Sequence, residues 1–205
     1  FGLRYLTDGK YRSRIPATMT RDTVQALLPH VGSPMDLDQY VDFAAMRTFR
    51  QSLLCRADQT PRPDPRPGDL AGLHVTSRWA PPRGVTDDDL RGDAVVEFSG
   101  TDDAKLRTNH PLTKAAFCIL ADRAPAAAAY DDLGPMAQAR LGTTAAPAAA
   151  DLDILGNYVL RAFASDQGLV RLSAHAPTFP TTPSARPLAR PLARRQATRG
   201  DEVTN

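Results

Sequence analysis

Residues 40–55, YVDFAAMRTFRQSLLC, join two hydrophobic periods with no glycine or proline between them. Up to Ala45 the apolar residues recur at helical spacing, and Asp36 is placed to cap that helix. From Phe49 to Arg56 apolar and polar residues alternate, as in a strand. The apolar positions of the helix are Leu37, Tyr40, Val41, Ala44 and Ala45. The pattern predicts a helix that runs directly into a strand and packs back on its sheet, with Tyr40 and Leu53 in the core.

The strand carries a family resemblance. Phe49–Cys55, FRQSLLC, resembles the FR-x-[ST]-LLC signature of the methyltransferase regulatory domain, a module of bacterial S-adenosylmethionine-dependent methyltransferases. Gly2–Leu6 is similar to the G-L-x-Y-L segment of the same family. Near the other end, Pro187–Asn205 resembles the RP-x-A-x-PLAR-x-QA-x-x-G-x-x-VTN segment that follows this domain in those enzymes. The matches bracket nearly the whole chain.

The resemblance implies a regulatory middle domain followed by the C-terminal part of such a methyltransferase. In that family the catalytic domain lies N-terminal to this region and binds S-adenosylmethionine, and some members methylate lysines of outer-membrane proteins. The implied partners are that catalytic domain, in cis, and a protein substrate. Because the sequence starts at Phe1 without a methionine, we expect a piece of a longer protein that has no methyltransferase activity alone.

Composition fits an intracellular globular chain. Its 205 residues are 42% hydrophobic, which is enough for a core, and the net charge of +2 gives no field that would attract nucleic acid or an anionic membrane. The two cysteines form no disulfide framework or zinc set, and no apolar run is long enough to cross a bilayer. A cytoplasmic location, with no nucleic acid and no membrane as partner, is expected.

The fold class predicted is α+β, with three ranges. Residues 1–108 are expected to form the regulatory domain, a small, mostly antiparallel sheet with two helices. Its strands are predicted at 1–7, 49–55, 73–79, 94–98 and 105–108, the last two joined as a hairpin. Thr20 is predicted to cap the first helix, and the prolines between Asp58 and Asp69 predict an extended loop.

Residues 109–182 predict three helices and then a β-ribbon, the winged-helix pattern. This raises an alternative function, a winged-helix DNA-binding transcriptional module. Its recognition helix would be Asp151–Ser165, which contains Asp151 and Asp153 and only one basic residue, Arg161. Because phosphate neutralisation supplies much of the affinity for DNA, a protein-interaction role is favoured. A purely structural spacer is a third option.

Residues 183–205 are expected to be an extended docking tail or linker. Arg-Pro-Leu-Ala occurs twice, and its prolines are taken to exclude a continuous helix. Leu188 and Leu192 are predicted to lie at least partly buried on another surface. Arg194 is predicted to make polar contacts with a domain.

No catalytic, cofactor-binding or metal-binding constellation is predicted within the chain; S-adenosylmethionine belongs to the intact enzyme. The sequence contains no glycine-rich strand-to-helix loop, and Asp87–Asp89 are interpreted as a solvated loop. Cys55 is interpreted as a buried structural thiol. Arg50 and Arg56 are expected on one strand face, either as a solvated edge or as an interface to a neighbouring domain.

Overall fold

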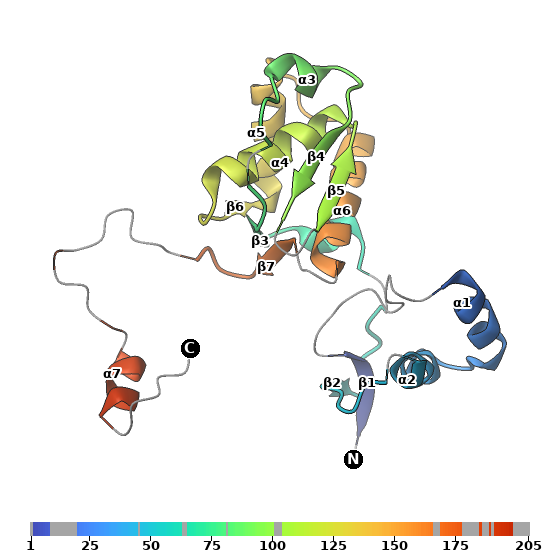
Figure 1. The fold of residues 1–205 in the computed structure, drawn as a ribbon. Helices are drawn as coiled ribbons and strands as arrows, with labels where there is room; N and C mark the ends of the chain where they lie inside the picture. The colour runs from blue at the N-terminus through green and yellow to red at the C-terminus, as the bar shows by residue number, and fades with distance from the viewer. Residues whose placement is uncertain are drawn as a thin grey trace.

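A computed structural model describes residues 2–8, 20–44, 46–62, 65–80, 82–100, 104–165, 169–177, 185, 189 and 191–198. Helices and strands form two groups in Figure 1. We call residues 2–8 and 20–62 the N-terminal module, and the described residues from 65 to 177 the body. A further short helix, α7 (Pro191–Ala197), lies apart from both. Small antiparallel sheets combined with helices confirm the α+β class.

The N-terminal module is a two-stranded sheet with two helices. Strand β1 (Leu3–Asp8) pairs antiparallel with β2 (Ser52–Arg56), with a bulge in β1 between Tyr5 and Thr7. Helix α1 (Arg21–Leu27) continues into a 3₁₀ turn, η1 (Leu28–His30), and α2 (Pro34–Ala44) follows. The Thr20 hydroxyl accepts a hydrogen bond from the Thr23 N–H at 3.2 Å, which confirms the predicted cap of α1.

Three predictions for this module are wrong. Helix α2 ends at Ala44 and β2 begins at Ser52, so the helix does not run directly into the strand. The cap of α2 is Ser33, whose hydroxyl accepts from the Asp36 N–H at 3.2 Å, rather than Asp36. Leu53 is 47% exposed instead of buried, in a sheet that has two strands among the described residues. Tyr40 is half-buried, beside the buried Val41.

The body contains the other two sheets. Strand β3 (His74–Ser77) lies between β6 (Ala128–Ala129) and β7 (Val170–Ser173), antiparallel to both. The predicted hairpin is confirmed as β4 (Val96–Ser99) paired with β5 (Lys105–Thr108). The single sheet predicted within residues 1–108 is wrong, because β3 takes its partners from beyond residue 108 and β1–β2 form a sheet of their own.

The three long helices of the body lie close to their predicted positions: α4 (Pro111–Arg123), α5 (Tyr130–Arg140) and α6 (Ala149–Ala164). Helix α4 is the centre of the core, since every residue from Leu112 to Ala121 is buried. The centre of the Phe117 ring on α4 lies 4.8 Å from the centre of the Trp79 ring and 5.4 Å from that of the Phe98 ring. Trp79 also donates its indole N–H to the Phe117 carbonyl, so its predicted packing role is confirmed.

The observed pairing of β7 differs from the β-ribbon predicted for a winged helix. The strand that pairs with β7 is β3, which precedes the three helices, whereas the predicted ribbon would return after residue 177. Residues 178–184, where that ribbon would turn, lie outside the described residues. The hydrophobic core runs from Leu70, in the 3₁₀ turn η2 (Pro67–Leu70), to Val170, and so crosses the boundary predicted after residue 108. The three predicted domain ranges remain predictions.

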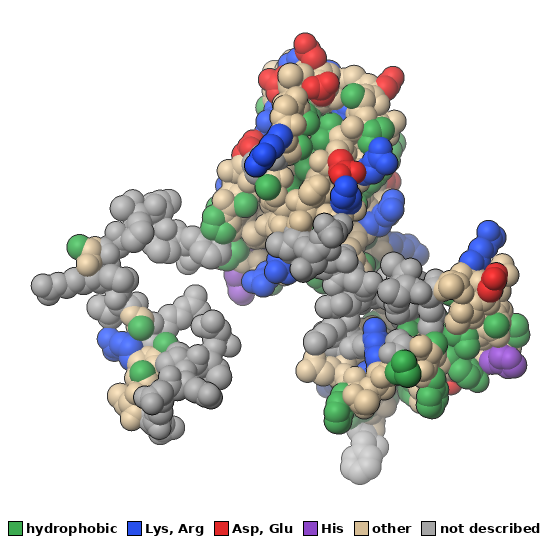
Figure 2. All heavy atoms as spheres, viewed as in Figure 1, with side chains coloured by type: hydrophobic (Ala, Val, Ile, Leu, Met, Phe, Trp, Pro, Cys, Tyr) green, Lys and Arg blue, Asp and Glu red, His purple; other side chains and the backbone are tan. Residues whose placement is uncertain are grey.

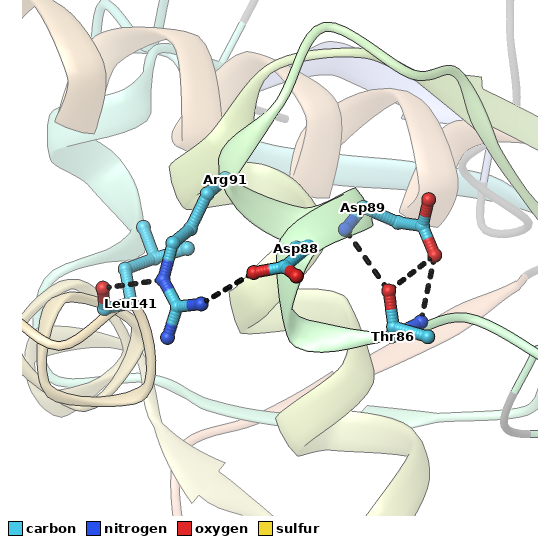
Figure 3. Close-up of polar contacts among 5 residues, drawn as sticks. All are labelled: Thr86, Asp88, Asp89, Arg91 and Leu141. Atoms are coloured by element: carbon cyan, nitrogen blue, oxygen red, sulfur yellow. Dashed lines mark hydrogen bonds and ion pairs between the residues drawn. The ribbon is translucent and has the colours of Figure 1, made fainter.

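Asp87–Asp89 do not form the predicted loop but begin a short helix, α3 (Asp87–Arg91). Thr86 and Asp89 form a capping box: the Thr86 hydroxyl accepts from the Asp89 N–H, and the Asp89 carboxylate accepts from the Thr86 N–H and hydroxyl (Figure 3). These bonds, the Thr86 hydroxyl foremost, hold the pKa of Asp89 below its usual value. Arg91 donates to the Leu141 carbonyl after α5 and pairs with Asp88 (Figure 3).

Lys114 joins α3 to α4 from inside the core. Its side chain projects from the buried face of α4, and its ammonium donates to the carbonyls of Asp89 and Gly92 at 2.6 Å each and of Ala94 at 3.0 Å. Burial lowers its pKa, although the charges of Asp93 and Asp89 act in the other direction. Three backbone acceptors therefore compensate a charged group that is removed from water.

Candidate interaction surface

Hydrophobic side chains are unusually exposed on the N-terminal module. Among the described residues, eight of the eleven large exposed hydrophobic side chains lie in it, and Val41 is the one residue of the module that is fully buried. The eight are Leu3, Leu28, Met35, Phe43, Met46, Phe49, Leu53 and Leu54. Figure 2 shows hydrophobic side chains at the surface beside α1 and α2. Two of the eight, Phe43 and Met46, line one pocket, and apolar side chains that gather at the surface are typical of an interaction site.

Two of these side chains, Phe43 and Met46, lie at the turn that ends α2. The Arg47 N–H bonds the Asp42 carbonyl at 2.9 Å and the Met46 N–H bonds the Phe43 carbonyl at 3.1 Å, the two bonds of a Schellman motif. Met46 occupies the left-handed position, with φ of 50°, where glycine is usual. A side chain there carries a conformational cost of about 1–2 kcal/mol.

A pocket of about 610 Å³ opens beside this turn. It is lined by Gln39, Asp42, Phe43, Met46 and Arg47, all from α2 and the turn that ends it. The lining combines an aromatic ring and a thioether with an amide and opposite charges. Such a mixture suits a partner side chain that is apolar and ends in a polar group.

Asp42 anchors the floor of the surface. Its carboxylate accepts from Arg50 Nε at 2.7 Å and lies 3.5 Å from Arg47 Nη1. The Arg50 guanidinium also lies 5.9 Å from the centre of the Tyr5 ring on β1, and the Tyr5 hydroxyl donates to Asp38 at 2.5 Å. Burial lowers the pKa of Arg50, but the hydrogen bond and charge of Asp42 raise it more, so the guanidinium stays charged. The cluster fixes β1, α2 and the approach to β2 together.

The structure places the two predicted interface arginines, Arg50 and Arg56, in different surroundings. Arg50 precedes β2 and turns inward to Asp42, whereas Arg56, at the end of β2, is exposed and lies 2.9 Å from Asp58. They therefore do not share one face of a strand. Their predicted role at an interface stays a prediction.

The tail departs from its predicted form. Pro191 begins helix α7 instead of preventing one, because proline is well accommodated in the first turn of a helix. Leu192 is 66% exposed and Arg194 is exposed beside it, so the described part of this chain does not cover them. Leu188 lies outside the described residues. Docking of this tail on another domain stays a prediction.

Two other residues whose side chains could take part in chemistry are His110 and Cys55. His110 occupies the N-cap position of α4 without a side-chain cap bond, and its ring lies 2.8 Å from the Thr113 hydroxyl and 3.2 Å from Asp151 on α6. Cys55 is half-buried rather than buried. Within the described ranges, no group of His, Cys, Asp and Glu side chains could hold a metal ion. The described helices also include none with the length and apolar character needed to cross a bilayer.

Sequence reasoning did not find Phe43 and Met46 or the pocket that they line. A signal was present: both residues lie off the predicted apolar stripe of α2, on a face that would otherwise be polar. The Asp42–Arg50 pair was also missed, because residues eight apart face each other only if the chain turns between them. The Schellman turn at Met46 provides that reversal.

Comparison with known proteins gives one family match and a shared fold. Residues 1–56 match the model of a family described as the predicted methyltransferase regulatory domain, whereas no match was found among curated proteins. PKMT2 from Rickettsia typhi is similar in structure, with a TM-score of 0.72, 19% identity, and coverage of 97% of this chain and 38% of PKMT2.

The structure of PKMT2 from Rickettsia typhi in complex with AdoHcy is similar as well, with a TM-score of 0.66, 19% identity, and coverage of 96% of this chain and 38% of that one. This chain thus spans well under half the length of either solved chain. The segment that contains the exposed hydrophobic surface is the segment that matches the predicted methyltransferase regulatory domain, as its resemblance indicated.

Proposed function

We propose that this chain is a regulatory, substrate-positioning region of a bacterial S-adenosylmethionine-dependent methyltransferase, and that its N-terminal module docks on the catalytic domain of the same polypeptide. The main support for the proposal is that the exposed hydrophobic side chains of the module lie within the residues that match the regulatory-domain family. A regulatory domain acts by contact, and contact requires a surface that gains by leaving water.

The comparison with PKMT2 supports the cofactor and the arrangement of the polypeptide. AdoHcy is what remains of S-adenosylmethionine after it has given up its methyl group, and one PKMT2 structure contains it. PKMT2 is a much longer chain than this one, which leaves room there for a separate cofactor-binding domain. By this proposal S-adenosylmethionine binds the catalytic domain, while the protein that is methylated rests partly against the region described here.

The geometry of the module fits a docking role. The Asp42–Arg50 pair and the Tyr5–Asp38 bond tie Arg50 and β1 to α2, the helix that carries Phe43. The strained backbone at Met46 keeps a large apolar side chain in solvent, and strain of this kind is commonly retained at functional sites. Because Phe49 is 93% exposed, it is the side chain with the most surface to gain from a partner.

Helix α6 does not have the charge that the DNA-binding alternative requires. Asp151 and Asp153 lie near its N-terminus, and Arg161 is its one basic residue. A recognition helix needs several cations to displace counterions from phosphates. These charges favour the methyltransferase proposal over a transcriptional one.

The first experiment separates a regulatory region from a complete enzyme. The purified 205-residue chain is titrated with S-adenosylmethionine in a calorimeter at millimolar cofactor, with PKMT2 from Rickettsia typhi as the positive control. We expect no saturable heat from the chain alone. Saturable binding would mean that this chain itself contains a cofactor site and would overturn the proposal.

The second experiment tests docking directly. The separately purified catalytic domain is titrated with the chain, with Phe49→Asp, and with Val95→Asp, which places the same charge at an exposed apolar site of the body. We expect Phe49→Asp to weaken binding by at least about tenfold, as for a central interface residue. Equal losses for both variants, or no binding of the unchanged chain, would contradict the proposed surface.

A further inference from the structure

The β1–β2 sheet of the N-terminal module has fewer strands than a sheet usually needs to be stable in water. Within the described residues β2 pairs with β1 alone, and no third strand joins them. Two strands by themselves are only marginally stable in water, and a third strand or a covering layer is the usual remedy. Four of the five residues of β2 are exposed, which fits a strand whose second edge is open.

The backbone alternation identifies the groups on that open edge. The Ala57 N–H bonds the Gly2 carbonyl at 2.8 Å, so the backbone polar groups of residue 57 face β1. Along a strand these groups alternate in direction, so those of Ser52, Leu54 and Arg56 face away from β1. Among the described residues, the backbone groups of Ser52 and Leu54 have no partner on this side, whereas the Arg56 carbonyl accepts from the Gln59 N–H at 3.0 Å.

The side chains do little to protect this edge. Natural edge strands carry central charges, prolines or bulges that prevent pairing with another chain. Strand β2 reads Ser-Leu-Leu-Cys-Arg, with its one charge at the last position, and the bulge of the sheet lies in β1. The central residue, Leu54, is 54% exposed.

We propose that the outer edge of β2 pairs with β2 of a second copy of this chain, antiparallel and centred on Leu54, to give a four-stranded sheet. In this register Leu54 faces Leu54 of the second copy, Leu53 faces its Cys55, and Ser52 faces its Arg56. Leu54 exchanges both backbone hydrogen bonds with Leu54 of the second copy, and the Ser52 carbonyl accepts from the Arg56 N–H of that copy, in both directions as a two-fold interface requires. The Arg56 carbonyl keeps its bond to the Gln59 N–H.

The sequence of β2 is complementary to itself in this register, which favours a second copy of the chain over a different partner at this edge. Every apolar residue of β2 meets an apolar residue, and each arginine meets a serine rather than another arginine. Like charges directly opposite each other would be destabilising, and this register contains none. The surface at Phe43, Met46 and Phe49 comes from other elements, so the dimer does not depend on the proposed docking to a catalytic domain.

The experiment measures the mass of the full chain by analytical ultracentrifugation from micromolar to near-millimolar concentration. We expect a concentration-dependent dimer. Leu54→Lys and Leu54→Glu each place like charges at the two-fold axis and should weaken the dimer by at least about tenfold, whereas an equimolar mixture of the two should restore it. Val95→Lys and Val95→Glu are matched controls, since Val95 is also 54% exposed but lies in the body.

Circular dichroism verifies that the exposed substitutions leave the fold unchanged. A chain that stays monomeric at every concentration, or a dimer that Leu54→Lys leaves unchanged, would overturn the proposal. So would a mixture of the two Leu54 variants that fails to associate although each is folded.

A covalent test fixes the register independently. In the proposed sheet, residue 53 faces Cys55 of the second copy in a non-hydrogen-bonded pair, with Cα atoms about 4.5 Å apart, which a disulfide can bridge. Oxidised Leu53→Cys should therefore run as a covalent dimer and should lose that dimer when Cys55→Ser is added. Val95→Cys should give none; a similar yield from Val95→Cys would contradict the register.

Discussion

The body and the N-terminal module use hydrophobic residues in opposite ways. In the body, α4 is buried along ten consecutive residues and even its lysine lies inside. In the module, one described residue is fully buried while phenylalanine, methionine and leucine side chains lie in solvent. The difference shows that apolar content alone does not locate a core. One region buries its apolar side chains in its own interior, whereas the other leaves most of its large apolar side chains exposed.

The largest expected effect is in the aromatic centre of the body. Phe117→Ala should lower the free energy of unfolding by about 3–5 kcal/mol, since it removes a fully buried ring that packs on Trp79 and Phe98. Urea unfolding followed by Trp79 fluorescence measures it. A loss below about 1 kcal/mol would mean that the body is no better packed than the module.

Lys114→Met should cost about 2–3 kcal/mol. The substitution keeps an apolar chain of similar length in the core but removes the donor from three carbonyls, which are then left without a partner. Thermal and urea unfolding measure the loss, with Lys105→Met as the control because Lys105 lies on the exposed side of β5. Equal effects of the two substitutions would contradict the structural role of the buried ammonium.

Thr86→Ala should cost about 1 kcal/mol at neutral pH, as the loss of a helix cap usually does. Asp89 adds a pH dependence: its pKa is lowered in the folded chain, so the folded state binds fewer protons and the contribution is full above the ordinary pKa of about 4. It is lost as the pH falls. Unfolding of both proteins at pH 7 and at about pH 3 should show a smaller difference at the acidic value; a difference that grows would contradict the capping box.

The smallest effect is expected in the module. Leu53→Ala should cost less than about 1 kcal/mol in the monomer, because the side chain is already 47% exposed. Leu120→Ala on α4, the same substitution at a fully buried site, should cost about 2–5 kcal/mol. The pair is compared at low protein concentration. Equal losses would mean that Leu53 has a core role after all, as the alternation in the sequence first predicted.

Periodicity predicted most of the elements but not their partners. The apolar face of α4 and the β4–β5 hairpin follow from spacing and turn residues, because these are local properties. The alternation at Leu53 also predicted a strand correctly, but it could not say whether anything covers that strand. The position of β3 between β6 and β7 depends on residues about fifty to a hundred positions away, which no local pattern contains.

The family match on residues 1–56 confirms the resemblance to a regulatory domain, and the candidate surface lies within the same segment. The individual residues were less accessible. Arg50 was placed on a strand face, although its partner Asp42 lies across the Schellman turn. The capping box was overlooked, although Thr86 followed three residues later by Asp89 is a recognisable signal.

The buried ammonium of Lys114 has a consequence for chemical labelling. An amine enclosed by three carbonyls is inaccessible to acylating reagents while α3 stays on α4. Helix α3 is too short to persist alone, so its departure and the exposure of the amine are one event. Lys105, on the exposed side of β5, reacts regardless and provides the reference rate. The rate of modification of Lys114 relative to Lys105 therefore reports how often α3 separates from α4.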